Sequence, residues 1–260
     1  MSKSNSNRDR RATVEQMRRE AKAAERRRTL VVITACAVVA LLIVGVAGWT
    51  IYQDNQDKKA AAATPLADIG ATAAAAACTD VKEADATGAG EHTTDPVVYD
   101  VQPPSYGKHN PTAADAGIHL YTVDDRPDVE ILVHNLEHGW TIVWYDETIA
   151  DDDATMKELE TAAATYDAHG SDPQYDVIFA PWTSDDGTAI PGGKHIAFTH
   201  WSIHQPTYDP SVFTTAQEAD TTIPSFGESE YCADFSGAAL GTFTTAYPYD
   251  DAPEGYLWHQ

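Results

Sequence analysis

The sequence predicts a single α/β or α+β domain with one mixed sheet and two or three helices, preceded by one transmembrane helix. Three observations predict this architecture. Residues 30–49 form an uncharged apolar run of twenty residues near the N-terminus. From residue 91 onward, short runs rich in β-branched and aromatic residues alternate with helical patterns. No internal repeat is visible, which favours one mixed domain over a repeat array.

Residues 30–49 are long enough to span a bilayer, because twenty helical residues extend about 30 Å. Thr34 is the only polar interruption. The apolar core of a cleaved signal peptide is shorter, about 7–15 residues, so the run favours an uncleaved anchor. Residues 1–28 carry ten Lys or Arg against four acidic residues. This basic flank predicts a single-pass protein of the cell membrane, with a cytoplasmic N-terminus and an extracytoplasmic C-terminal domain.

The rest of the chain is strongly acidic. From residue 29 onward, seven Lys or Arg stand against thirty-six Asp or Glu, and the whole chain has a net charge of −23. Such a surface repels nucleic acid and anionic lipid, so we exclude nucleic acid as a partner of the outer domain. The charge is explained most simply as a means of keeping the domain soluble.

Composition divides the chain into four segments. We expect a basic cytoplasmic segment at residues 1–29, the transmembrane helix at residues 30–49, an Ala/Thr/Asp-rich tether at residues 50–90, and an extracytoplasmic domain at residues 91–260. The tether has few large apolar residues to bury, and its last part, from Cys78, is expected to join the domain through a disulfide.

Within the domain, β-branched and aromatic runs predict strands and capping residues predict helices. Asp151, Asp152 and Asp153 favour the start of a helix at residues 154–168, which Gly170 and Pro173 end. The predicted strands are residues 96–101, 118–123, 131–133, 140–145, 175–180 and 194–201. A short helix at residues 214–220, a C-terminal helix at residues 230–247 and an aromatic tail with Tyr256 and Trp258 complete the prediction.

The three cysteines differ in their predicted surroundings. Cys36 lies in the membrane span, whereas Cys78 and Cys232 both lie outside it. Two cysteines in an oxidising extracytoplasmic space usually pair, so we expect a Cys78–Cys232 disulfide. Metal ligation by these thiols is the alternative, but no C-x-x-C context supports it.

Residues 129–145 contain the most informative stretch. Two apolar β-rich runs flank four polar residues, His134, Asn135, Glu137 and His138, and a polar group of this kind inside a predicted core is the place to expect chemistry. The β-branched surroundings and Gly139 predict a strand, a tight turn and a second strand here.

The domain resembles the DUF 3105 family, a group of envelope-tethered bacterial domains. The resemblance covers about residues 91–260, and its most specific part is the motif His-Asn-Leu-Glu-His-Gly at residues 134–139. Residues 103–109 are similar to the family's Pro-Pro-Thr-Ser-Gly-Pro-His, with Tyr106 in place of Ser and Lys108 in place of Pro as departures, and residues 197–201 and 252–254 match further short motifs. The family name implies no activity, but the resemblance supports the choice of site.

Transition-metal binding is the leading functional hypothesis. Imidazole and carboxylate ligands suit copper or zinc, and ten histidines occur in a chain that is poor in lysine. The predicted ligands are His109, His134, Glu137, His138 and His200, supported by Gly107, Asn135 and Gly139. Delivery, storage or sensing of the metal outside the membrane would follow.

Two alternatives stay open. The same polar residues are equally able to form a buried hydrogen-bond network without a ligand, in a domain that serves as an interaction module or as an accessory subunit of an envelope or respiratory complex. The spacing His134-x-x-Glu137-His138 also fits the inverted zincin pattern of a zinc metallohydrolase, which requires a helix. No G-x-S-x-G, G-x-G-x-x-G or P-loop occurs, so the sequence favours a protein that is not an enzyme.

Overall fold

The computed structural model describes residues 3–170, 172–204 and 224–255. These residues divide into two compact units, Met1–Gln56 and Asp57–Gln260, which we describe separately.

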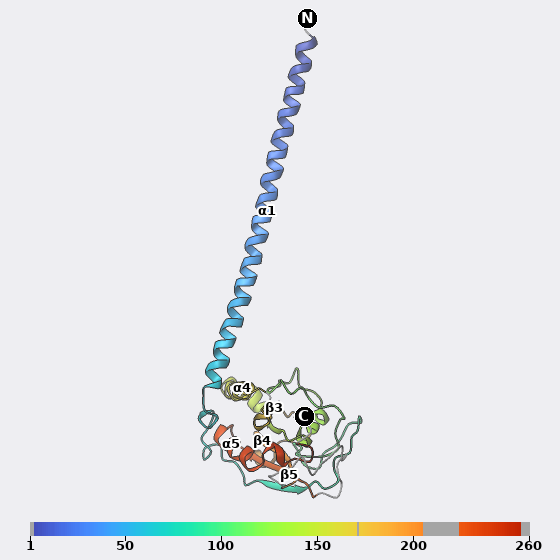
Figure 1. Ribbon diagram of the computed structural model, residues 1–260, viewed down its shortest axis with the longest axis vertical. Coiled ribbons are helices and arrows are strands. Elements are labelled where there is room, and N and C mark those ends of the chain that lie inside the picture. The colour runs from blue at the N-terminus through green and yellow to red at the C-terminus, as the bar shows by residue number, and fades with distance from the viewer. Residues whose placement is uncertain (1–2, 171, 205–223, 256–260) are drawn as a thin grey trace. The chain divides into compact units, whose positions relative to one another are not determined.

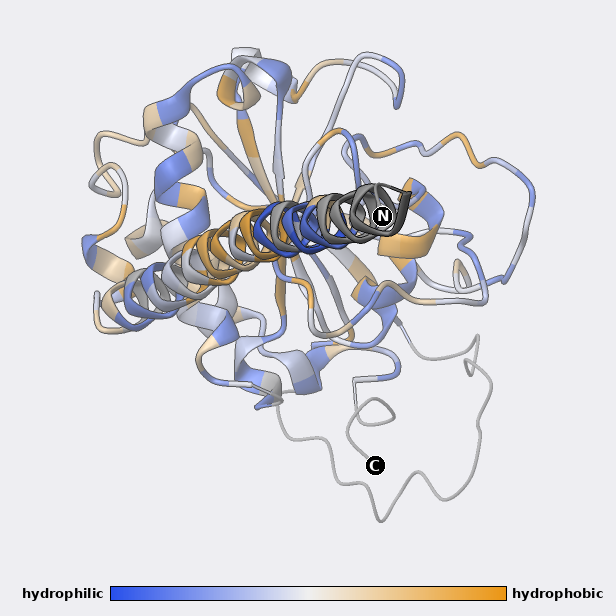
Figure 2. Cartoon of the chain, turned by 90° about the horizontal axis from the view of Figure 1, so that it is seen from above, coloured by the Kyte–Doolittle hydropathy of each residue, from blue (hydrophilic) through white to orange (hydrophobic). Residues whose placement is uncertain are grey.

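The first unit belongs to a single long helix, α1 (Lys3–Ala62). One part of α1, Glu15–Gln53, is long and apolar enough to cross a membrane, as judged by length and composition alone. Its apolar stretch lies between hydrophilic stretches of the same helix (Figure 2). A candidate anchor is therefore present where the sequence predicts one.

The second unit is built on a mixed sheet of five strands in the order β1-β5-β4-β2-β3. Of these strands, β3, β4 and β5 are labelled in Figure 1. The strands are β1 (Lys82–Asp85), β2 (Thr141–Tyr145), β3 (Val177–Pro181), β4 (Ile196–Ser202) and β5 (Phe226–Cys232). Only β2 and β3 pair in parallel; the other neighbours are antiparallel. The helices of this unit are α2 (Val129–Glu137), α3 (Glu147–Ala150), α4 (Asp153–Asp167) and α5 (Gly237–Ala246). The prediction of one mixed-sheet α+β domain is confirmed.

Alternate residues of the strands pack into two separate hydrophobic cores, one on each face of the sheet. On one face, Leu159 of α4 and Phe243 of α5 pack with Phe198 and other strand residues. On the opposite face, Leu136 of α2 packs with Trp201 and its neighbours. The side of the sheet that a β4 residue faces is therefore decided by its position in the alternation.

The prediction of a strand and turn at residues 131–139 is wrong, because these residues form α2. The β-branched Val129, Ile131 and Val133 suggested a strand, but the fully or nearly buried residues Val129, Leu132, Val133 and Leu136 recur at the spacing of a helix. The gain from burying that face against the sheet outweighs the weak helix propensity of β-branched residues. The strand predicted at residues 140–145 is present as β2.

Other elements were predicted with mixed success. The helix at residues 154–168 corresponds to α4, and the strands at residues 175–180 and 194–201 correspond to β3 and β4. Residues 96–101 form no strand, and residues 118–123 contribute only an isolated bridge from Leu120 to Phe179. The predicted helix at residues 230–247 begins only at Gly237, because residues up to Cys232 complete β5 and Ser236 caps the helix. The predicted helix at residues 214–220 lies outside the described residues.

The segment predicted as a tether is partly folded. β1 forms the edge of the sheet, Ala76 and Ile69 are buried, and Cys78 is bonded to Cys232. Residues before the expected domain boundary at residue 91 therefore belong to the folded unit, in keeping with the expectation that the chain from Cys78 joins it. Low hydrophobicity misled the prediction, since an edge strand needs only backbone pairing and small alanines fit a core as well as large residues do.

Candidate metal centre

Helix α2 brings three of the expected site residues together. His134, Glu137 and His138 are separated by three and four positions, so α2 and its C-cap present them on one side. All three are buried, and the Nε2 atoms of His134 and His138 lie 2.8 Å apart. The correction from strand to helix therefore produces the geometry that the His-x-x-Glu-His spacing requires.

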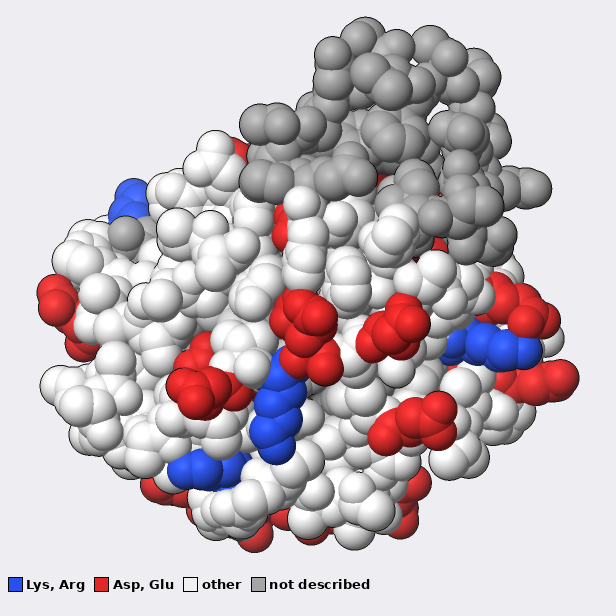
Figure 3. Space-filling view, turned by 90° about the horizontal axis from the view of Figure 1, so that it is seen from below, with Lys and Arg blue, Asp and Glu red and all other residues white. Residues whose placement is uncertain are grey.

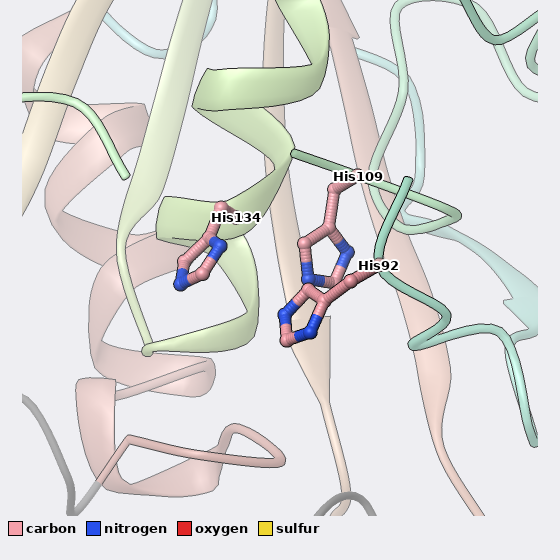
Figure 4. A group of neighbouring side chains, drawn as sticks. All are labelled: His92, His109 and His134. Atoms are coloured by element: carbon pink, nitrogen blue, oxygen red, sulfur yellow. The ribbon is translucent and has the colours of Figure 1, made fainter. Parts of the chain in front are cut away.

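Two further histidines approach from extended segments. His92 and His109 form an isolated parallel bridge, and their rings lie beside that of His134 (Figure 4). One ring nitrogen from each of these three histidines lies within 4.8 Å of the others. His109 is fully buried, whereas the side chain of His92 is 50% exposed and gives the group its contact with solvent. His92 was not among the predicted ligands.

Backbone carbonyls orient the buried rings. Nδ1 of His109 lies 2.8 Å from the Gly107 oxygen, and Nδ1 of His134 lies 2.6 Å from the Asn110 oxygen. A carbonyl oxygen only accepts hydrogen bonds, so both Nδ1 atoms must donate. In the neutral imidazole the proton is then absent from Nε2, and the Nε2 lone pairs of both rings face into the group.

The environment disfavours protonation of the α2 histidines. Burial lowers the pKa of His138 to about 4, helped by the nearby His134. Burial also lowers the pKa of His134, and the Asn110 carbonyl offsets part of this effect. Both imidazoles are therefore neutral ligand-type groups near neutral pH, and Nδ1 of His138 lies 3.4 Å from the Glu254 carbonyl oxygen.

Glu137 lies between the helical histidines and His109. Its Oε2 is 2.9 Å from Nε2 of His109 and 3.9 Å from Nε2 of His92. Burial is the largest single influence and lowers the pKa of His109, but the Glu137 carboxylate, the Gly107 carbonyl and the charge of Glu254 together outweigh it, so the net shift of the pKa is upward. In spite of their closeness, neither His109 Nε2 nor Glu137 Oε2 has a hydrogen-bond partner of acceptable geometry among the described residues. Two buried polar atoms thus point into the same small space without a good partner.

A second carboxylate reaches the site from the C-terminal segment. The Glu254 backbone N–H donates to the Glu137 carbonyl oxygen at 2.8 Å, which ties this segment to α2. Burial, and then the charge of Glu137, raise the pKa of Glu254 to about 7. In the sequence, residues 252–254 stand out only as a family motif, and Glu254 is not among the predicted site residues. Neither it nor His92 lies near the central motif in the sequence, and only the tertiary fold brings them there.

The structure does not bring His200 into this group. In β4, Trp201 faces α2, and its ring centroid is 6.0 Å from that of His109. His200 is the preceding residue and therefore points to the opposite face of the sheet. The prediction that His200 joins His134 and His138 is wrong, because strand alternation separates them.

The predicted supporting residues have structural roles. Asn135 exchanges hydrogen bonds with the backbone of Ala114, accepting at 2.8 Å and donating at 3.3 Å. Gly107 supplies the carbonyl that orients His109. Gly139 has a φ of +93°, and a Cβ there would collide with the Tyr249 carbonyl oxygen. Each of the three therefore fixes backbone around the cluster.

The fold and the site define a small α+β domain with a buried imidazole and carboxylate cluster, in a chain that carries a candidate membrane helix. Residues 92–212 match the family described as "Protein of unknown function (DUF3105)". This match supports the family resemblance and includes His92, His109, His134 and His138, but not Glu254. No curated protein and no solved structure matches the chain.

Proposed function

We propose that the protein binds a copper or zinc ion through its histidine cluster, in an extracytoplasmic domain held at the cell membrane by α1. The observation that supports this most strongly is the convergence of ring nitrogens from His92, His109 and His134 within 4.8 Å of one another. His138 extends the group, since its Nε2 lies 2.8 Å from that of His134.

The orientation of the rings supports a cation. If His134 and His138 are both neutral and both donate from Nδ1 to a carbonyl, their Nε2 lone pairs face each other at 2.8 Å. This arrangement is unfavourable. Either His138 places its proton on Nε2 at the expense of its 3.4 Å contact with the Glu254 carbonyl, or a cation accepts both lone pairs. Metal-bound histidines commonly donate their second ring N–H to a carbonyl, as His109 and His134 do here.

The charges also favour a divalent ion. Glu137 is 1% exposed and Glu254 is mostly buried, and burying carboxylates without compensation is costly. Among the described residues, the ion-pair partners of both glutamates are histidines, which carry a charge only when protonated, and none is Lys or Arg. A divalent cation would neutralise both groups. Several imidazole nitrogens with a carboxylate and no thiolate suit copper or zinc.

Binding is better supported than hydrolysis. Helix α2 does provide the two histidines and the glutamate of a zinc metallohydrolase on one side. A general base must, however, reach a water molecule beside the metal. Glu137 is buried and lies against His109, which leaves it little room for that role. We therefore propose a role in metal delivery, storage or sensing.

The proposed location rests on separate features. The basic segment before the apolar part of α1 favours a cytoplasmic N-terminus. The Cys78–Cys232 disulfide favours an oxidising compartment for the second unit. Acidic side chains are scattered over the face of the molecule in Figure 3, where basic ones are few, so nucleic acid is an unsuitable partner.

The test is a titration of the purified full chain in detergent with Cu²⁺ and Zn²⁺, followed by metal analysis. We expect one ion at the histidine cluster of the wild type, and the affinity of that site should fall at least about 100-fold in the His134→Ala/His138→Ala variant, which removes two ligands and should bind one ion fewer per chain. His169→Ala is the matched control, because His169 is exposed and stacks on Tyr175 outside the cluster.

Equal metal binding by the double variant and the wild type would overturn the proposal. Absence of binding by the wild type would favour the alternative, an interaction module with a ligand-free hydrogen-bond network. In that case, pull-down from solubilised membranes should recover an envelope or respiratory protein with the wild type.

A further inference from the structure

A row of polar side chains crosses the sheet on the face opposite to the histidine cluster. Glu83 of β1 lies directly opposite Glu228 of β5, and Glu228 lies directly opposite His200 of β4. Directly opposed residues of antiparallel strands project from the same face of the sheet. All three side chains therefore belong to the face that α5 covers, away from α2.

His204 completes this group from the chain just after β4. Its Nε2 lies 2.9 Å from Oε1 of Glu228 and 3.6 Å from Oε2 of Glu83. Ligand-type atoms of these three residues lie within 4.8 Å of one another. The His204 ring stacks on Phe226 with a centroid distance of 4.3 Å, so its nitrogen is held in place.

The two glutamates create a charge problem. Like charges directly opposite each other in neighbouring strands destabilise a sheet. Glu228 is 1% exposed, so water does little to relieve the repulsion from Glu83. Among the described residues, both glutamates form ion pairs with His204, and neither forms one with a Lys or Arg. A bound cation would relieve the repulsion.

His200 provides an independent indication. It is fully buried, and its Nδ1 lies 3.3 Å from Oγ1 of Thr141. Its Nε2 has no hydrogen-bond partner in the described part of the chain. Native proteins rarely leave a buried polar nitrogen unpaired, so an unaccounted ligand beside it is a natural explanation. The ring lies next to Glu228 in the row and stacks on Tyr247, whose hydroxyl donates a hydrogen bond to Glu228.

We propose that this group is a second metal site, separate from the histidine cluster. Its ligands are two carboxylates and one imidazole whose ligand-type atoms converge, those of Glu83, Glu228 and His204, and His200 is the neighbour of Glu228 in the row. Carboxylate oxygens suit harder cations such as Mn²⁺, and imidazole suits zinc and iron, so the site is expected to take a divalent first-row ion such as Mn²⁺ or Zn²⁺. Tyr247, through its hydrogen bond to Glu228, and Phe226, through its stacking on His204, would hold these ligands in place.

The test uses the full chain in detergent, with the His134→Ala/His138→Ala substitutions present so that the histidine cluster is disabled. Binding of Mn²⁺ is followed through the loss of the electron paramagnetic resonance signal of the aqueous ion, and Zn²⁺ is tested by equilibrium dialysis. We expect one ion per chain. Adding Glu83→Gln should weaken binding by at least about tenfold, because one charged ligand is lost.

Glu83 is chosen because its side chain is 53% exposed, so its substitution should leave the fold intact. Glu160→Gln is the matched control, since Glu160 is a similarly exposed glutamate on α4 that pairs with Lys157. Circular dichroism of each variant checks folding. If neither Mn²⁺ nor Zn²⁺ binds to the cluster-disabled chain, or if Glu83→Gln binds as tightly as the control, the second site is refuted. Neither result bears on the histidine cluster, which has its own variants.

Discussion

At the level of single residues, two backbone carbonyls determine the orientation of the buried histidine rings. The Gly107 and Asn110 oxygens fix the protonated nitrogen of His109 and His134 and thereby turn the other nitrogen inward. The ligand character of these side chains therefore depends on loop backbone more than on neighbouring side chains. A residue that shapes that backbone should matter as much as a histidine itself.

Gly139 shapes the backbone just after α2, beside His138, and Gly139→Ala should be strongly destabilising. Its φ of +93° disfavours any side chain, and a Cβ would collide with the Tyr249 carbonyl oxygen. We expect the free energy of unfolding to fall by about 2–4 kcal/mol. Gly170→Ala is the control: its φ of +62° is also positive, but a Cβ there meets nothing within 4 Å. It should cost about 1 kcal/mol. Urea denaturation measures both, and equal losses would contradict the role of the close approach.

Asp176 should make stability depend on pH. Burial, and then the charge of Asp172, raise the pKa of Asp176 to about 8 from a model-peptide value of 3.8. The folded state therefore holds a proton that the unfolded state releases between these values, so the free energy of unfolding decreases as pH rises from about 4 to about 8. The loss at pH 8 should be on the order of a few kcal/mol.

Asp176→Asn should remove most of this dependence, because the amide does not titrate. Denaturation of the wild type and the variant at several values between pH 5 and pH 8 measures the slope. Asp185→Asn, at an exposed turn, should leave the slope unchanged. A wild-type slope retained in Asp176→Asn would show that another group is responsible.

Among the elements, α2 connects the core to the cluster. Its buried apolar side packs against the sheet, and the same helix presents His134, Glu137 and His138. The sequence identified these three residues from their chemistry, but it assigned the wrong secondary structure to them. Counting positions would have corrected this, because the apolar residues at 129, 132, 133 and 136 fit a helical period and not an alternating one.

Leu136→Ala tests this connection. Leu136 is fully buried, so truncation should leave a cavity and lower the free energy of unfolding by about 2–5 kcal/mol. Because the helix can then shift against the sheet, copper or zinc affinity should also fall. Ile131→Ala is the control on the same helix, since Ile131 is only partly buried and should cost less. Leu136→Ala with unchanged metal affinity would show that the cluster does not depend on helix packing.

Other parts of the site were beyond the reach of the sequence for identifiable reasons. His200 was assigned to the wrong face because a strand's alternation has meaning only once its neighbours are known. His92 and Glu254 come from segments without regular secondary structure, so no periodic pattern marks them. β1 pairs through its backbone at the sheet edge and shows no hydrophobic signal. In contrast, the anchor and the disulfide partners follow from composition and compartment, which are properties of sequence alone.

At the scale of the whole molecule, charge and redox chemistry give the two units different expected surroundings. The basic residues of the first unit precede its apolar stretch, and the second unit is acidic and contains the Cys78–Cys232 bond. A reducing cytoplasm would oppose that bond, and the distribution of basic residues favours the cytoplasm for the N-terminus. Both features lead to the same orientation although they are physically independent.

The orientation is testable with reporters fused to the C-terminus of the full chain. We expect alkaline phosphatase, which requires an oxidising compartment, to be active, and a fluorescent protein that matures only in the cytoplasm to be dark. Replacing Arg26, Arg27 and Arg28 by Glu should reduce phosphatase activity, because basic residues beside the apolar stretch set the orientation. The matched control replaces Arg8, Arg10 and Arg11 by Glu, since these residues lie further from the apolar stretch and should have less effect. A fluorescent cytoplasmic fusion of the wild type would place the histidine cluster inside the cell and would require a different role for it.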